Sequence, residues 1–256
     1  MIRFNKKIIQ NKFNRASTSY DSVAGIQKEC AQILTQLLKD FNPDFYPQSI
    51  LDLGCGTGYM LDNLCPFFPD SSYIINDIAV SMLECVESKW KTRTSTKPFS
   101  FYLGDMEEMP FEFYNLIVSN FALQWAHHLE SMLVKCYSHS DYFAFSTLLS
   151  GTFKEWVSLL QKNNFSSSVP LYPSFDELQK ELLKLKPLQS HFLVKDFQMI
   201  FKNAKEFIKY LKSLGASIGS PIISLRQAAL FNEFIKNHNA PLTITYQVFF
   251  GLLKRG

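Results

Sequence analysis

The sequence has few cysteines, and none has the spacing that a disulfide framework or a zinc site needs. Five cysteines are spread over 256 residues, at positions 30, 55, 65, 85 and 136, and no C-x-x-C pair occurs. An odd number of widely spaced cysteines argues against both kinds of site. We therefore expect a protein of a reducing compartment that binds no metal.

Long hydrophobic runs are also absent, and so is a large excess of charge of one sign. No run of about 18 apolar residues occurs, and the N-terminal MIRFNKKIIQNKF carries charge throughout, unlike a signal peptide. The formal net charge of +3 is too small to indicate nucleic-acid binding. These absences predict a cytoplasmic protein that interacts with neither membranes nor nucleic acids.

The sequence does contain enough apolar material for a large core. Hydrophobic residues make up 46% of the chain, which suits one large α/β domain or a core domain with an insertion. Strand patterns alternate with helical patterns from residue 50 onwards, the strands lying at SILDLG, SYIIND, FSFYLGD, NLIVSN and YFAFSTL. Such alternation favours a parallel sheet with helices on both faces.

The regions on either side of this alternation differ from it. Residues 1–22 are polar and broken in pattern, whereas residues 23–38 have helical spacing. Residues 152–190 are helical in pattern and rich in Lys, Ser and Leu, which favours a helical insertion over an independent domain.

Two later segments, FQMIF and TITYQVFF, alternate with period two and are predicted to be strands. Between them, Asn203 is expected to cap a helix that stops at Gly215.

Three glycines stand at every second position where the first predicted strand meets a helix, in ILDLGCGTGYMLDNL. Gly54, Gly56 and Gly58 leave this loop without Cβ atoms, so backbone N–H groups can approach a ligand near the positive end of the helix. The spacing differs from the G-x-G-x-x-G of dinucleotide-binding proteins, and no Lys-Ser/Thr pair follows. We expect a ligand other than a pyrophosphate, with a simple tight turn as the alternative.

Three aspartates accompany the glycine loop. Asp77 ends the second strand, where a carboxylate can accept both hydroxyls of a ribose, and Asp105 follows the third, where it can reach an adenine amino group. Asp52 lies inside an apolar strand, and a cationic amino-acid group would explain it. Together they fit S-adenosylmethionine, whose parts spread across the ends of neighbouring strands.

The segments ILDLGCGTG, IIND and LGDMEEMP resemble the motifs of class I S-adenosylmethionine-dependent methyltransferases, over about residues 45–150. This resemblance implies a Rossmann-like α/β fold with a mostly parallel seven-stranded sheet, helices on both faces and a helical insertion after the fifth strand. It also implies S-adenosylmethionine as the cofactor. The residues then expected to bind it are Asp52, Gly54, Cys55, Gly56, Gly58, Asp77, Ile78, Asp105, Met106 and Asn120.

Further blocks resemble the malonyl-acyl-carrier-protein O-methyltransferases of biotin synthesis and span nearly the whole chain. They are FNRASTSYDSVAGIQ, SNFALQW, FSTLLSGTFKE, LKSLGAS and PLTITYQVFFGLLKR. The resemblance implies one domain over residues 1–256, divided into a helical cap (1–45), a cofactor-binding core (46–150), a helical insertion (151–190) and C-terminal strands and helices (191–256). It implies methylation of the free carboxylate of a malonyl thioester on an acidic acyl-carrier protein.

Such a reaction needs no catalytic base. A carboxylate with a pKa of about 4 is ionised at neutral pH, and its attack on a sulfonium methyl group needs alignment and desolvation. His127 and His128 are therefore interpreted as loop residues. The catalytic candidates are Tyr20, in a helix that the resemblance places over the cofactor, and Gln124 and Trp125, after the fourth strand. Packing is the alternative role for Tyr20 and Trp125.

A buried malonyl carboxylate should be paired with a cation. Arg15, Lys212 and Arg226 are the candidates, and the sequence does not choose among them. Lys205, Lys209 and Lys212 form one stripe of a predicted helix. A solvated charged face is the default interpretation of this stripe, and a docking surface for an acidic carrier protein is the alternative.

Two other functions stay open at the level of sequence. The fold fixes the cofactor but not the acceptor, so another small carboxylate is possible as the substrate. A non-catalytic assembly factor that binds the cofactor belongs to a different class.

Overall fold

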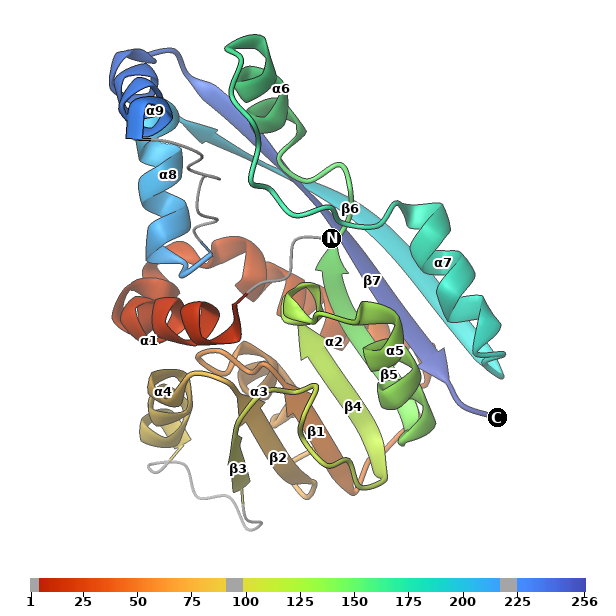
Figure 1. Cartoon of the computed structure of the whole chain (residues 1–256). Coiled ribbons are helices and arrows are strands. Elements are labelled where there is room, and N and C mark those ends of the chain that lie inside the picture. The colour runs from red at the N-terminus through yellow and green to blue at the C-terminus, as the bar shows by residue number, and fades with distance from the viewer. Residues whose placement is uncertain (1–4, 91–98, 217–224) are drawn as a thin grey trace.

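The computed structural model describes residues 5–90, 99–216 and 225–256, and these residues build one sheet of seven strands (Figure 1). The strands are β1 Ser49–Leu53, β2 Ser72–Asp77, β3 Phe99–Leu103, β4 Tyr114–Asn120, β5 Ser140–Leu148, β6 Gln189–Phe201 and β7 Leu242–Lys254. Their order is β3-β2-β1-β4-β5-β7-β6, with β1 to β5 parallel and β7 antiparallel to both of its neighbours.

Helices precede the sheet, connect its strands and cover it. They are α1 Lys6–Val23, α2 Gly25–Phe41, α3 Tyr59–Leu64, α4 Val80–Trp90, the short 3₁₀ helix η1 Leu123–Trp125, α5 Leu129–Ser138, α6 Lys154–Lys162, α7 Phe175–Lys184, α8 Ala204–Ser213 and α9 Leu225–Asn237.

Alternation along the strands produces a core on each face of the sheet. Ile50 and Leu116 pack into one apolar cluster with residues of α2, α3, α4, α6 and α8, whereas Leu51 and Ile117 pack into a second cluster with α5 and α7. All four side chains are fully buried. Because both faces are covered, β1 and β4 carry apolar residues at consecutive positions, Ile50–Leu51 and Leu116–Val118, as expected for central parallel strands.

The sequence prediction of the fold is confirmed. The sheet is mostly parallel, helices lie on both faces, and α6 and α7 follow the fifth strand. Strand order reverses between β1 and β4, since the chain continues from β1 to β2 and β3 and then returns to β4. This reversal opens a crevice at the carboxyl ends of β1 and β4.

Residues 1–22 look polar and broken in sequence pattern, yet α1 begins at Lys6, capped by the Asn5 side chain, and runs to Val23. Its apolar stripe is thin, with Ile9 and Ala16 buried. A helix that lies over loop ends, as α1 does in Figure 1, covers polar backbone as well as core and needs few apolar residues.

The edge strand β6 begins at Gln189, eight residues before the predicted FQMIF segment. It pairs along its whole length with β7. Its first half is exposed or half-buried and carries mixed polar residues, which an edge strand tolerates and which hides the period-two signal.

The predicted helix after Asn203 is confirmed. The Asn203 side chain accepts a hydrogen bond from the Glu206 backbone N–H (3.0 Å), and α8 ends at Ser213, just before Gly215 with φ of +70°. Of the helices in the described ranges, none has the length and apolar character needed to cross a bilayer.

Candidate active site

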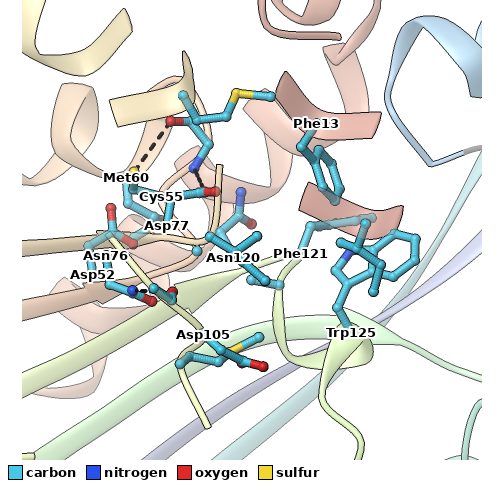
Figure 2. A pocket seen from close by; sticks show the side chains of 18 of the residues that line it. Phe13, Asp52, Cys55, Met60, Asn76, Asp77, Asp105, Asn120, Phe121 and Trp125 are labelled. Atoms are coloured by element: carbon cyan, nitrogen blue, oxygen red, sulfur yellow. Dashed lines mark hydrogen bonds between the residues drawn. The ribbon is translucent and has the colours of Figure 1, made fainter. Parts of the chain in front are cut away.

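Loops that follow β1, β2, β3 and β4 enclose an open cavity of about 770 Å³ at the crevice. Figure 2 shows two sides of it: Asp52, Asn76 and Asp77 lie on one side, and Phe13, Phe121 and Trp125 on the other. The first side is polar and formed by strand ends. The second is aromatic, and α1 contributes Phe13 to it.

Gly54 stands where the loops after β1 and β4 touch. A Cβ atom added to it would lie 2.3 Å from the Ala122 Cβ atom, and its φ is +68°. Both the space and the backbone conformation therefore require glycine. Glycine at this position lets the two loops pack directly against each other beside the cavity.

Asp52 is a buried carboxylate without a counter-charge. Its side chain is 1% exposed, and neither carboxylate oxygen has a hydrogen-bond partner. Burial, and to a lesser extent the nearby Asp77 carboxylate, raise the pKa of Asp52 to about 8. Such an orphaned acid at a cavity wall is suited to a ligand that brings an ammonium group.

Asp77 holds the glycine loop in place. Its two oxygens accept hydrogen bonds from the Gly56 N–H (2.9 Å) and the Ala79 N–H (2.8 Å). Burial raises the pKa of Asp77 to about 6, although these backbone hydrogen bonds favour the charged form. Because a carboxylate has about four acceptor positions, two remain for a ligand with paired hydroxyls.

Asp105 is paired with a residue that the sequence interpretation did not include. The Lys6 ammonium contacts both Asp105 oxygens (3.1 and 3.0 Å) and the Glu107 carboxylate (2.6 Å). Glu107 also accepts hydrogen bonds from the backbone N–H groups of His127 and His128. This network connects the start of α1 with the loops after β3 and η1.

Polar contacts continue along α1 over the cavity. Gln10 donates a hydrogen bond to the Ile78 carbonyl (2.9 Å), and the Asn14 side chain accepts one from the Ser81 N–H (3.0 Å). Ile9 and Phe13 line the cavity from the same helix. The first half of α1 therefore covers the polar side of the cavity.

A second cavity, of about 450 Å³, lies next to the first and shares part of its wall. Phe13, Tyr20, Phe121 and Trp125 line both cavities. The ring of Phe13 packs edge-on against Trp125, with centroids 5.6 Å apart. Ligands bound in the two cavities would therefore both contact these aromatic side chains.

Comparisons with known proteins agree with this geometry. A methyltransferase domain profile matches residues 50–140. The malonyl-[acyl-carrier protein] O-methyltransferase of Neorickettsia risticii is 34% identical over 256 residues, which cover 98% of this chain and 97% of that protein. The chain belongs to the malonyl-[acyl-carrier protein] O-methyltransferase family. It is a methyltransferase, and S-adenosylmethionine is its cofactor.

Two more distant proteins share parts of this similarity. A biotin biosynthesis bifunctional protein of Teredinibacter turnerae is 31% identical over 153 residues, covering 56% of this chain and 27% of that protein. The magnesium protoporphyrin IX methyltransferase of Synechocystis PCC 6803, crystallised with bound SAH, has a TM-score of 0.59 at 13% identity and covers 98% of this chain and 100% of that one. The last likeness shows the fold.

Most of the residues predicted to bind the cofactor lie around the first cavity. Nine line the first cavity: Asp52, Gly54, Cys55, Gly56, Asp77, Ile78, Asp105, Met106 and Asn120. Gly58 instead starts α3 and does not line the cavity. Asn120 is fixed by hydrogen bonds to the Gln27 carbonyl (2.9 Å) and from the Ser146 hydroxyl (2.7 Å).

The predicted catalytic residues lie at or beside the shared wall. Tyr20 and Trp125 line both cavities, and Gln124 lines the second, where its amide donates to the Phe121 carbonyl (2.8 Å). Burial raises the pKa of Tyr20 well above its usual value, so its hydroxyl stays protonated. His127 and His128 lie in the loop before α5, as expected.

The three predicted substrate cations are not brought together. Arg15, Lys212 and Arg226 are exposed on α1, α8 and α9, and none lines either cavity. The sequence interpretation also omitted Lys6, Phe13 and Asn76, which line the first cavity. Ile9, Phe13 and Tyr20 are spaced at i, i+4 and i+11, so they share one face of a helix. This spacing could have predicted that α1 covers the cavity.

Proposed function

We propose that this methyltransferase transfers a methyl group to the free carboxylate of a malonyl thioester carried by acyl-carrier protein, an early step of biotin synthesis. The observation that carries this proposal is the 34% identity over nearly the full length of both chains to an enzyme of that name. The similarity to a biotin biosynthesis protein supports the pathway.

The first cavity fits the cofactor. Asp52 would hold the ammonium group, Asp77 the ribose hydroxyls and Asp105 the adenine amino group. When bound, S-adenosylmethionine supplies an electrophilic methyl group: a carboxylate oxygen forms a bond to its carbon, the carbon–sulfur bond breaks, and the electron pair stays on sulfur. The absence of partners around the Asp52 oxygens supports this placement.

The residues at the shared wall align the reactants and exclude water. Phe13, Phe121 and Trp125 form an apolar surface between the two cavities. No proton leaves the acceptor, because a carboxylate is ionised at neutral pH, so the site needs no general base. Alignment and desolvation are the contributions expected from these side chains.

The carrier protein is proposed to dock on α8. Lys205, Lys209 and Lys212 are exposed on this helix, whereas Phe207 and Leu211 on its other side are buried. Leu214 and Ala216, which follow α8, line the second cavity. A basic stripe beside that cavity would attract an acidic carrier and direct its acyl arm inwards.

The cytoplasm is the proposed compartment. All five cysteines lie in the described part of the chain, and no disulfide joins any two of them, which agrees with a reducing environment.

The proposed reaction is tested by intact-protein mass spectrometry of the carrier. We expect malonyl-carrier protein, incubated with the enzyme and S-adenosylmethionine, to gain the mass of one methyl group, and acetyl-carrier protein, which lacks the carboxylate, to gain nothing. Methylation of malonyl-coenzyme A but never of the carrier form would reject the carrier as substrate. Cofactor binding without methylation of any malonyl thioester would favour another acceptor or a non-catalytic role.

A further inference from the structure

The described lining of the second cavity offers no charged group to an acceptor. Among the described residues that line it, none is a Lys, Arg, His, Asp or Glu. A malonyl carboxylate that entered it would therefore lose its water without gaining a salt bridge from these residues. Polar contacts must come from neutral groups.

Tyr246 is the neutral group best placed for this role. It projects from β7, lines the second cavity and is 3% exposed. Its hydroxyl makes no hydrogen bond of good geometry, and the Tyr210 hydroxyl lies close to it. Its ring packs edge-on against Phe153, with centroids 4.7 Å apart, which fixes its direction. A buried hydroxyl that does not donate a good hydrogen bond costs stability, so a ligand that accepts a hydrogen bond from it is favoured.

A second tyrosine supports the first from behind. Tyr210 of α8 is 8% exposed, its hydroxyl also has no partner of good geometry, and it does not line the cavity. Burial raises the pKa of Tyr210 to about 12, and burial together with the nearby Tyr210 raises the pKa of Tyr246 well above its usual value. Both phenols therefore stay protonated and can donate.

The second cavity contains one further orphaned group. Gln27 is 6% exposed, lines the cavity, and its side-chain oxygen has no partner. Since the two ends of an amide are interchangeable, Gln27 can offer a donor or an acceptor. An apolar cavity with two buried polar groups that lack a hydrogen bond of good geometry, the Tyr246 hydroxyl and the Gln27 side-chain oxygen, is a built site for a small polar acyl group.

Resting on the proposed function, we propose that the acceptor carboxylate is held by the uncharged hydroxyl of Tyr246, which Tyr210 positions, and not by a cationic side chain. The chemistry favours this arrangement. Negative charge on the acceptor disappears as the ester forms, so a cation held against it would stabilise the ground state more than the transition state. The positive charge that balances the carboxylate then belongs to the bound cofactor.

The test uses binding rather than turnover. Malonyl-pantetheine is titrated calorimetrically into the full-length enzyme saturated with sinefungin, a cationic unreactive cofactor analogue, or with the neutral product S-adenosylhomocysteine. We expect tighter binding in the sinefungin complex, and Tyr246→Phe should raise the Kd for malonyl-pantetheine roughly tenfold to a hundredfold there. The Kd for sinefungin itself should change less than about twofold.

Tyr142→Phe is the matched control. Tyr142 is a buried tyrosine near the start of β5 that lines neither cavity. Its hydroxyl accepts a hydrogen bond from the Asn42 side-chain amide (2.6 Å). Its removal should leave acceptor binding unchanged. If Tyr246→Phe does not fold, as judged by thermal melting, Tyr210→Phe replaces it with a smaller expected rise in Kd.

Unchanged acceptor binding in Tyr246→Phe, equal binding in the two cofactor complexes, or loss of binding in Arg226→Ala or Lys212→Ala instead would overturn the inference while leaving the proposed function in place. Failure of the wild-type enzyme to bind malonyl-pantetheine, together with failure to methylate malonyl-carrier protein, would reject the proposed function and the inference with it.

Discussion

At the scale of single residues, Asp52 couples the cofactor site to pH. Its pKa of about 8 means that it is largely protonated at neutral pH before a cation arrives. A ligand ammonium favours the ionised form, so its binding must release the proton. Affinity for the cofactor should therefore rise with pH up to about 8, where the ligand amino group begins to lose its own proton.

We predict that the Kd for S-adenosylhomocysteine falls about tenfold or more between pH 6 and pH 8, measured by calorimetry. Asp52→Asn should bind more weakly at pH 8 and lose most of the dependence between pH 6 and pH 8. The dependence near pH 6 should persist, because Asp77 has a pKa of about 6. An unchanged pH profile in the variant would assign the effect to another group.

The same residue makes an opposite prediction for stability. The folded pKa of Asp52, about 8, exceeds the unfolded value of about 3.9. Between these values the folded state binds more protons, so this carboxyl lowers the free energy of unfolding as pH rises. Without ligand, the free energy of unfolding of Asp52→Asn should rise relative to that of the wild type by up to about 1.4 kcal/mol per pH unit between pH 4 and 8. Denaturant melts at several pH values test this, and a constant difference would contradict it.

Asp77 supports both the glycine loop and the ligand. Asp77→Ala removes two backbone hydrogen bonds to the loop and the proposed ribose contact. We expect the Kd for S-adenosylmethionine to rise about tenfold to a hundredfold in calorimetry. Asp70→Ala, at an exposed aspartate, is the control and should bind normally. If Asp77→Ala binds S-adenosylmethionine as tightly as the wild type, the proposed contact between Asp77 and the ribose is wrong.

At the scale of elements, α1 covers the cofactor cavity. Its first turn is held by the contact of Lys6 with Asp105 and Glu107, and these side chains are 19%, 13% and 16% exposed. A partly buried ion pair of this kind is screened less by salt than a surface pair. Opening of α1 should therefore be slow compared with the motion of an exposed terminus.

Lys6→Ala should accelerate cofactor exchange. With the first turn of α1 released, the association and dissociation rates of the cofactor should both rise several-fold. The Kd should change less, because the substitution also frees Asp105 from Lys6 and leaves it available to the ligand. Stopped-flow measurement of protein tryptophan fluorescence tests this, because Trp125 lines the cavity. Lys7→Ala, at an exposed neighbour, is the control. Identical rates in Lys6→Ala and wild type would show that α1 does not limit access.

At the scale of the whole molecule, the proposed docking side for the carrier is the basic stripe of Lys205, Lys209 and Lys212 on α8. Reversing charge at Lys209 and Lys212 should raise the KM for malonyl-carrier protein about tenfold and leave cofactor affinity unchanged. Lys180→Glu on α7, on the opposite face of the sheet, is the matched control. A KM that responds equally to both changes would indicate general charge effects without a docking surface.

The sequence specified the sheet and the cofactor loop well because both depend on local patterns. Apolar strands around Ile50 and Leu116, and the glycines beginning at Gly54, show their roles in residue type and spacing alone. Lys6 and Tyr246 could not be assigned in this way, because their roles arise from contacts between elements far apart in the chain. The expected cationic partner was inferred from charge balance alone, and the described lining of the second cavity contains none.

A crystal structure of the enzyme with sinefungin and malonyl-pantetheine tests most directly whether the two cavities hold the two reactants. We predict adenosine between Asp77 and Asp105 and the amino-acid end against Asp52. The malonyl carboxylate should lie within hydrogen-bond distance of the Tyr246 oxygen, beside Phe121 and Trp125, which line both cavities. A nucleoside bound elsewhere, or a malonyl group outside the second cavity, would contradict it.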